Sequence, residues 1–327
     1  MLSTRFTDLV GCTVPIQQAG MGDLANPRLA AAVADAGGLG MVSMYGYPPD
    51  LIADVLDRLG QQTAGCIGAN FIMLFVDPDQ ANECVAAAAE KVRVVDFFYT
   101  APDAALVEIV HDHGALVCWQ VGSKEEAATA VAAGCDFVIA QGIEAGGHVR
   151  GRIGLLALLS EVLDTVDVPV LAAGGIGTGR AMAAALAAGA DGVRVGTRFV
   201  AAEEAEARPT YVNALIAARP QDTVYTEAFG VGWPPPDAPH RLLRSCLQAA
   251  ESFKGEIVGE GMDYYTGERF PIGRFHPIGV TKSYTGAIEA MSLWAGESVG
   301  GVKKIESAAH IVRDIAGEAE RLLRRWR

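Results

Sequence analysis

Residues 122–142 read GSKEEAATAVAAGCDFVIAQG, and residues 177–197 read GTGRAMAAALAAGADGVRVGT. The two stretches superpose without gaps, and each runs from a loop through an Ala-rich segment with helical spacing to a glycine and an apolar run. Each therefore predicts a loop, a helix and a buried strand, in that order. The likeness reflects either a duplicated unit or the shared composition of Ala-rich units, and the fold prediction depends on neither.

Apolar runs of the same kind recur along the first two hundred residues, at 14–19, 39–43, 66–71, 92–98, 115–121, 136–140, 168–173 and 192–196. Ala-rich stretches with helical spacing, such as PRLAAAVADAG at 27–37, separate them. Strands that alternate with helices over short connections run parallel, and near-continuous apolar strands fit a sheet covered on both faces. Eight such units predict an α/β fold, a (β/α)₈ TIM barrel over residues 1–203. A doubly wound open sheet, which uses the same local units, is the alternative.

The pattern changes after residue 203. Longer helical stretches at 240–253 and 311–327 follow a Pro-rich turn at 233–239. We expect residues 204–327 to form a mainly helical appendage, a substrate-side or lid region that packs on the barrel mouth. Trp233 and Trp294 are then apolar contacts at the mouth or parts of an ordinary core.

Composition limits the partners of the chain. Half of its 327 residues are hydrophobic, and 26 Lys and Arg against 39 Asp and Glu give a net charge of −13. This charge disfavours nucleic acid and anionic membrane surfaces. Neither a membrane-spanning apolar run nor a signal peptide is recognisable, so we expect a cytoplasmic protein that binds a small molecule. The six scattered cysteines indicate buried thiols, and the oligomeric state stays open, a homo-oligomer included.

Glycine clusters after the seventh and eighth runs predict a phosphate site. The seventh run is followed by GGIGTG at 174–179, which includes Gly174 and Gly175, and the eighth ends in RVGT at 194–197. Glycines let a phosphate approach main-chain N–H groups, a following helix N-terminus favours its negative charge, and these two loops are the usual phosphate site of a barrel. A dinucleotide fingerprint is the weaker interpretation, because no acidic partner follows at the expected distance.

The loop after the sixth run carries the one histidine at the predicted mouth, His148. Imidazole titrates near neutral pH, so His148 is a candidate acid and base, and Gly146 and Gly147 beside it let it approach a flat ligand. Glu144 and Arg150 either orient His148, bind substrate charge or are solvated. We predict no metal site, because His111 and His113 come just before a strand at the opposite face, where their HDH spacing indicates a surface connection. The appendage histidines, His240, His276 and His310, have no sequence neighbours that argue for catalysis, although one of them could fold over the mouth.

The remaining strand ends are apolar or carry amides: Gly20, Met21, Ser43, Asn70, Gln120 and Gln141. Few charges line the predicted mouth. This composition fits a large, planar, partly apolar cofactor that is held by amides and main chain.

Together these motifs resemble the nitronate monooxygenase family, formerly grouped as 2-nitropropane dioxygenases, among the FMN-dependent (β/α)₈ barrels. The likeness covers nearly the whole chain and rests on PIQQAGMG at 15–22, DAGGLGMVS at 35–43, GANF at 68–71, QGIEAGGH at 141–148, AAGGIGTG at 172–179, RVGT at 194–197 and MSLWAGESVG at 291–300. The combination of EAGGH and GGIG is specific, whereas either alone is weak.

The resemblance implies an FMN site and a reaction. His148 matches the catalytic histidine of the family. FMN contacts are implied at Gly20, Met21, Asn70, Gln141, Gly146, Gly175, Arg194, Val195, Gly196 and Thr197, and we add Gln120, Gly147 and Gly174 from the same loops and strand ends. In such enzymes an alkyl nitronate gives an electron to FMN, O₂ captures the product, and a carbonyl compound and nitrite are released without a metal.

Two positions depart from the family pattern. QAGM at 18–21 stands where many members have APM, and Arg150 interrupts the common GGHxG. Arg150 suggests an anionic substrate as a hypothesis. An FMN-dependent NAD(P)H reductase of a quinone or an enoyl thioester is the alternative enzyme, because related barrels share the EAGGH and GGIG loops. A flavin-binding module without activity is the non-enzymatic alternative. An IMP dehydrogenase-like barrel needs a cysteine in a Gly/Ser-rich loop, and none of the six lies in one.

Overall fold

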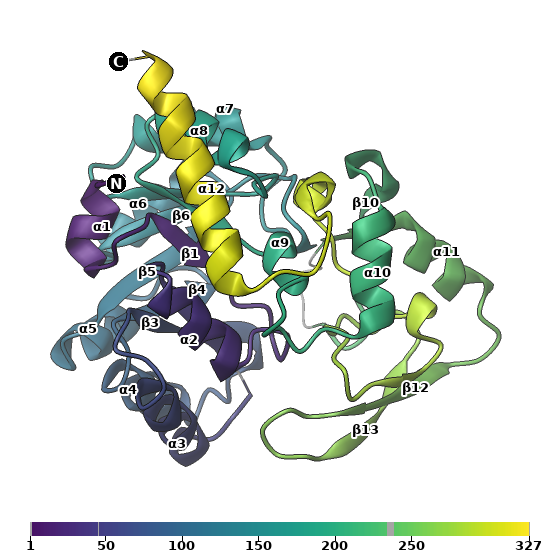
Figure 1. Cartoon of the computed structure of the whole chain (residues 1–327). Helices are drawn as coiled ribbons and strands as arrows, with labels where there is room; N and C mark the ends of the chain where they lie inside the picture. The colour runs from purple at the N-terminus through teal and green to yellow at the C-terminus, as the bar shows by residue number, and fades with distance from the viewer. Residues whose placement is uncertain (1, 45, 234–238, 327) are drawn as a thin grey trace.

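A barrel of eight parallel strands forms the centre of the computed structural model, which describes residues 2–44, 46–233 and 239–326 (Figure 1). The strands are β1 (Ile16–Gln18), β2 (Gly40–Ser43), β3 (Ile67–Ile72), β4 (Val94–Phe98), β5 (Leu116–Val121), β6 (Phe137–Gln141), β8 (Val170–Ala173) and β9 (Gly192–Val195). They pair in the order β1-β9-β8-β6-β5-β4-β3-β2, and a parallel bridge from Gln17 to Leu39 closes the ring. All eight expected strands and the TIM barrel are confirmed.

The two repeated stretches fold alike. Helices α6 (Lys124–Ala132) and α8 (Gly179–Ala187) precede β6 and β9. The hydroxyls of Ser123 and Thr178 cap the two helices by accepting hydrogen bonds from the third backbone N–H, as expected for helix starts of this type. Both strands are buried along their whole length, so each unit has the predicted order of loop, helix and core strand.

Helices surround the barrel, and the last one comes from the C-terminus. The ring consists of α2 (Pro27–Asp35), α3 (Pro49–Gly60), α4 (Ala81–Ala89), α5 (Ala104–Asp112), α6, α7 (Leu155–Leu163), α8 and α12 (Ala308–Leu323). α12 packs between α8 and α2, and its Ile311 and Ile315 belong to the barrel's apolar core (Figure 1). The chain therefore leaves the barrel after β9 and returns at residue 308 to complete it. α1 (Arg5–Val10) lies at the amino-terminal ends of the strands, where Phe6 packs on Phe137.

Residues 201–307 form an excursion with its own core beside the barrel mouth. Its helices are α10 (Pro209–Ala217) and α11 (Arg244–Ser252), and α9 (Thr197–Val200) leads into it. One small antiparallel sheet lies within it, made of β12 (Ile257–Met262), β13 (Arg269–Gly273) and β14 (Thr285–Gly286). A second one joins it to the barrel loop after β6, because β10 (Thr223–Thr226) and β11 (His240–Leu243) pair with β7 (Gly147–His148). Three short 3₁₀ helices lie within the excursion, at Pro220–Asp222, Ile288–Ala290 and Glu297–Gly301. Two more follow β3 and α12, at Met73–Phe75 and Arg324–Trp326.

The two helices expected in the C-terminal region are both present, and one of them starts later than expected. The helix expected to start at residue 240 starts at Arg244 instead, because residues 240–243 pair as a strand with β7 and β10. The expected helix near the C-terminus is confirmed as α12. Within the Pro-rich turn, residues 234–238 lie outside the described residues.

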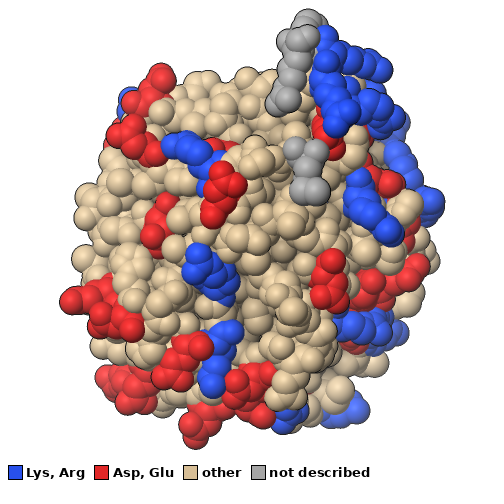
Figure 2. All heavy atoms as spheres, turned by 60° about the vertical axis from the view of Figure 1, so that its left-hand side comes forward, with Lys and Arg blue, Asp and Glu red and all other residues tan. Residues whose placement is uncertain are grey.

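The structure shows how the charged side chains and the cysteines of the sequence are distributed. Acidic and basic side chains are interspersed over the face seen in Figure 2. All six cysteines are free thiols, five of them buried and Cys66 half-buried, as expected. Among the helices of the described ranges, none combines the length and the apolar character that crossing a bilayer requires.

Candidate active site

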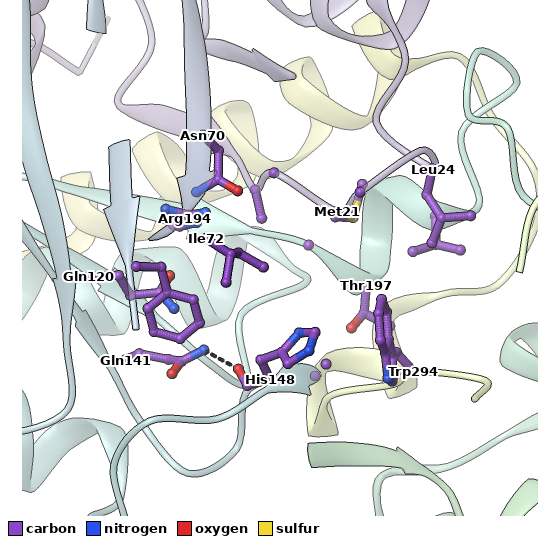
Figure 3. Close-up of a pocket in the computed structure, with 18 of the residues that line it drawn as sticks. Met21, Leu24, Asn70, Ile72, Gln120, Gln141, His148, Arg194, Thr197 and Trp294 are labelled. Carbon is purple, nitrogen blue, oxygen red and sulfur yellow. Dashed lines mark hydrogen bonds between the residues drawn. The ribbon is translucent and has the colours of Figure 1, made fainter. Parts of the chain in front are cut away.

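A cavity opens where the barrel strands end (Figure 3). Asn70 lies in the second half of β3, Gln141 is the last residue of β6, Gly20 comes two residues after β1, and Gly196 directly follows β9. The other lining residues are Ala19, Met21, Gly22, Leu24, Ile72, Phe98, Gln120, Gly146, Gly147, His148, Arg194, Thr197, Val200, Tyr211 and Trp294. The cavity thus combines amide side chains, main chain and apolar walls, and it lies at the end of a barrel where active sites are built.

A second cavity continues the first on the side of β8 and β9. The two share Gln120, Gln141, Gly146, Arg194 and Thr197, among other residues, so they form one cleft. The far end of the cleft is walled by Gly174, Gly175, Ile176 and Ser298, and Gly196 lines both cavities. Gly174 and Gly175 have φ angles of +110° and +67°, which residues with a side chain rarely adopt. This end of the cleft is therefore a main-chain cradle just before α8.

His148 projects into the cavity from β7 (Figure 3). Gln141 fixes the backbone around it, because its side-chain amide donates to the carbonyl of His148 at 2.9 Å and accepts from the N–H of Arg150 at 2.9 Å. The Nε2 atom of His148 is buried and finds no partner among the described residues. Burial and, to a lesser degree, His240 hold the pKa of His148 well below its ordinary value. The ring is therefore neutral near pH 7 and available for proton exchange or for a ligand.

Aromatic rings surround His148. The centroid of its ring lies 4.2 Å from that of Trp233, 4.4 Å from that of His240 and 5.0 Å from that of Trp294. Trp294 lines the cavity, whereas Trp233 touches His148 from outside the lining. His240 is the histidine of the C-terminal region that reaches the mouth, because β11 pairs with β7 so that residues 240 and 148 face each other. Sequence reasoning left that position open, since only the strand pairing identifies it.

A buried ion pair lies below the cavity floor. Arg194 Nη1 is 2.6 Å from Asp96 Oδ2, and the two side chains are 6% and 0% exposed. Asn70 donates to the same carboxylate at 2.8 Å and accepts from Ser43 at 3.2 Å. Burial raises the pKa of Asp96, whereas Arg194 and Asn70 lower it. Asp96 was missed in the sequence, where its one signal is a carboxylate within the apolar run 92–98.

Glu144 and Arg150 do not line either cavity. The carboxylate of Glu144 accepts from the N–H of Leu155 at 3.0 Å, since the cap residue of α7 is Gly154 and has no side chain to do so. The guanidinium of Arg150 donates to Glu126 at 2.9 Å and to the carbonyl of Tyr99 at 3.3 Å. The structure therefore places both side chains in contacts that hold loops together.

The other residues predicted for cofactor binding gather at the cleft. Gly20, Met21, Asn70, Gln120, Gly146, Gly147, Arg194 and Thr197 line the first cavity, and Gly174 and Gly175 the second. Val195 is buried in β9 and lines neither cavity. Thr197 also accepts a hydrogen bond from the N–H of Gly296 at 3.0 Å, which ties the MSLWAGESVG segment to the cleft wall.

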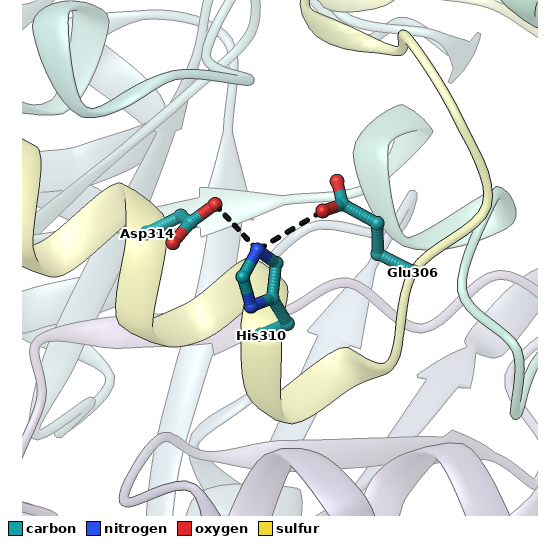
Figure 4. A group of neighbouring side chains, drawn as sticks. All are labelled: Glu306, His310 and Asp314. Atoms are coloured by element: carbon teal, nitrogen blue, oxygen red, sulfur yellow. Dashed lines mark ion pairs between the residues drawn. The ribbon is translucent and has the colours of Figure 1, made fainter.

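The remaining histidines lie away from the cleft. His111 pairs with Asp136 at 3.0 Å on the outside of the barrel. His310 lies on α12 between Glu306 and Asp314, at 3.0 and 2.9 Å (Figure 4). The three ligand atoms come within 4.8 Å of one another, but the carboxylate of Glu306 already pairs with Arg198 and Lys304. This cluster is therefore neutralised by cationic side chains.

The cleft fits FMN in three respects. Its glycine-walled end offers main chain where a phosphate needs N–H donors. Its wide end has apolar walls and the amides of Asn70, Gln120 and Gln141, which suit a flat ring with polar edges. The unpartnered Nε2 of His148 is a buried polar atom that a ligand in the cavity would satisfy.

One family model matches nearly the whole chain, and the similar proteins carry names of different activities. A model described as "Nitronate monooxygenase" matches residues 3–318. The "(3aS,4S,5R,7aS)-5-hydroxy-7a-methyl-1-oxo-octahydro-1H-indene-4-carboxyl-CoA dehydrogenase" of Rhodococcus jostii is 35% identical over 79% of this chain and 70% of its own. FabK from Thermotoga maritima superposes with a TM-score of 0.81 at 31% identity, over 100% of this chain and 99% of its own. Nitroalkane oxidase from Streptomyces ansochromogenes superposes with a TM-score of 0.79 at 28% identity, over 99% of this chain and 100% of its own.

Proposed function

This chain belongs to the nitronate monooxygenase family, and we propose that it uses FMN to oxidise alkyl nitronates with O₂ to a carbonyl compound and nitrite. The chain is thus an oxidoreductase, and the proposal specifies its cofactor and reaction. The observation that carries the proposal is the placement of His148. Its Nε2, unpartnered among the described residues, stands at the apolar end of a cleft whose other end is a glycine cradle.

FMN would occupy the cleft along its length. The main chain at Gly174, Gly175 and Gly196 would hold its phosphate, and Asn70, Gln120 and Arg194 would face its ring. The middle of the FMN molecule would contact residues that line both cavities, among them Gln141, Gly146 and Thr197. When bound, FMN supplies the electron-transfer chemistry that no protein side chain provides.

His148 would handle protons beside the reacting carbon. Because burial keeps the imidazole neutral near pH 7, Nε2 can accept a proton from a nitroalkane carbon and so generate the nitronate within the site. The hydrogen bonds from and to Gln141 hold the backbone of His148, so the ring keeps its place during proton exchange. Trp294 and the other apolar walls exclude water from the same space.

The reaction balances without a further reductant. Two nitronate anions and one O₂ give two carbonyl compounds and two nitrite ions. In each nitronate the C=N bond breaks, the carbon gains one oxygen atom from O₂, and nitrogen leaves with its own two oxygens. The alkyl part of the nitronate needs apolar surroundings, and Leu24, Ile72 and Phe98 provide them.

Anaerobic mixing tests this proposal. Purified protein loaded with FMN is mixed with a primary alkyl nitronate or with NADH, and the loss of flavin absorbance is followed. The proposal predicts rapid bleaching by the nitronate and, in air, equal amounts of nitrite and carbonyl product. Bleaching of the flavin by NADH but not by the nitronate would contradict the proposal.

A second candidate is an FMN-dependent oxidoreductase of acyl thioesters, including the NAD(P)H-dependent reduction of an enoyl thioester or a quinone. The name of the R. jostii relative, a carboxyl-CoA dehydrogenase, favours it. The wall formed by Phe98, Val200, Tyr211 and Trp294 also suits a larger apolar acyl group. NADH bleaching followed by reoxidation with an enoyl thioester would select this candidate.

A matched pair of variants isolates the role of His148. With a neutral nitroalkane as substrate, His148→Gln should retain the yellow colour of bound FMN and lose turnover, because glutamine cannot accept the proton from carbon. His276→Gln is the control, since His276 is another half-buried histidine with a lowered pKa that does not line the cleft. Equal turnover of the two variants would refute the proton-handling role.

A further inference from the structure

Arg194 is the sole residue with a formal charge among the described residues that line the cleft. The other lining groups are apolar side chains, amides, hydroxyls, glycines and the neutral His148. A flavin ring in the cleft would therefore meet one full charge from the wall. In a site closed to water, one charge has a larger effect than it has at a surface.

Asp96 cancels that charge from behind. It is fully buried, lines neither cavity, and contacts Arg194 at 2.6 Å. The Sγ of Cys118 and the amide of Asn70 complete its surroundings, at 3.6 Å and 2.8 Å. None of these groups adds a further cation, so the pair of Arg194 and Asp96 makes the floor of the cleft electrically neutral.

The pair is also connected to the loop after β1. The N–H of Gly22 donates to Ser43 at 3.2 Å, Ser43 donates to Asn70 at 3.2 Å, and Asn70 donates to Asp96. Gly22 adjoins Met21, which lines the same cavity. One chain of hydrogen bonds therefore fixes both Arg194 and the opposite edge of the cavity, with Asp96 as its shared acceptor.

We propose that Asp96 is a positioning residue that sets the reduction potential of the bound flavin, by cancelling the charge of Arg194 and holding its guanidinium in place. The inference rests on the proposed FMN site. Reduction adds negative charge to a flavin ring, so a compensated arginine stabilises the reduced ring less than a free one. With Asp96 present, the reduction potential of the flavin is therefore lower than it would be beside an unpaired Arg194.

Asp96→Asn tests this inference, because it removes the negative charge at nearly constant volume. The potential is measured by equilibrium reduction of the FMN-loaded protein against a reference dye. We expect the equilibrium to shift at least tenfold towards the reduced flavin, which is about 30 mV for a two-electron couple. An unchanged or lowered potential in a folded, FMN-loaded variant would overturn the inference.

Asp191→Asn is the matched control, at a second buried carboxylate. Asp191 is also a buried carboxylate paired with an arginine, Arg5, at 2.7 Å, but it lies just before β9, at the other end of the barrel. This variant should lose stability and keep the parent potential. An equal shift in both variants would overturn the inference, since the effect would then not depend on the cleft.

The double variant Asp96→Asn/Arg194→Gln covers the case in which Asp96→Asn does not fold. A buried arginine without a partner is costly, whereas removing both charges leaves no unpaired ion. The double variant should therefore fold, and its potential should be at or below that of the parent. A potential above that of the parent would contradict the inference.

Failure of the proposed function gives a different result. If the parent protein binds no FMN, the proposed function and this inference are both wrong. If the parent binds FMN and is bleached by nitronate, but Asp96→Asn shows no shift, the inference alone is wrong.

Discussion

Gly146 and Gly296 meet backbone to backbone at the cleft, and replacing Gly146 with alanine should both destabilise the fold and weaken FMN binding. A Cβ on residue 146 would lie 2.3 Å from the N atom of Gly296, 2.8 Å from the carbonyl carbon of Ala295 and 3.0 Å from Oγ1 of Thr197. Two of these atoms are backbone and cannot rotate away. The EAGGH loop and the MSLWAGESVG segment would have to separate.

The cost follows from these contacts. Forced overpacking costs about 1–3 kcal/mol. Separating the segments also breaks the buried hydrogen bond from the N–H of Gly296 to Thr197, which contributes about 1 kcal/mol. We therefore expect the free energy of unfolding to fall by about 2–4 kcal/mol. Because Gly146 lines both parts of the cleft, the dissociation constant of FMN should rise at least tenfold, or about 1.4 kcal/mol.

Urea unfolding of the apoprotein and fluorescence titration with FMN measure the two effects. Gly317→Ala is the control, since Gly317 is exposed in the middle of α12 and a Cβ there meets nothing within 4 Å. It should stabilise the protein by about 0.5–1 kcal/mol and leave FMN affinity unchanged. If Gly146→Ala matched the parent in both measurements, the close approach of the two segments would be wrong.

Three further predictions concern the cleft. Gly175→Asp should bind FMN at least tenfold more weakly than Gly175→Asn, because both side chains tolerate a φ of +67° and only aspartate repels a phosphate. Equal affinities of the two variants would place the phosphate elsewhere. For a neutral nitroalkane, kcat/KM should fall with decreasing pH only well below the ordinary histidine pKa of 6.5, because His148 must be neutral to accept the proton and burial lowers its pKa. A fall in kcat/KM that begins above pH 7 would contradict this role. Arg150→Ala should lower kcat/KM for anionic and neutral substrates by the same factor, since the guanidinium binds Glu126 and the carbonyl of Tyr99. A loss confined to anionic substrates would instead indicate that Arg150 contacts the substrate directly.

The barrel could be predicted from the sequence because its signals are local. Each strand is a short apolar run, and helices such as α6 and α8 start at the capping residues Ser123 and Thr178. The glycine cradle followed from the same logic, because Gly174 and Gly175 come directly after a strand whose end had to face the mouth. These features depend on residues that are close in the chain.

What the sequence did not predict depends on pairing between distant residues. His240 reaches His148 only because β11 pairs with β7, and residues 240–243 carry helix-forming side chains that offer no sign of this strand. Asp96 gains its role from Arg194 on a strand far along the chain. The sequence left open whether Glu144 orients His148, binds substrate charge or is solvated, and its contact with Leu155 depends on the missing side chain at Gly154, which leaves Glu144 to cap α7.

The most direct test of the account is a crystal structure of the protein grown with FMN. It should show the phosphate against the main chain of Gly174, Gly175 and Gly196, with the ring between Arg194 and the imidazole of His148. An FMN molecule with its phosphate at the His148 end, or a cleft that excludes FMN at saturating concentration, would contradict the account.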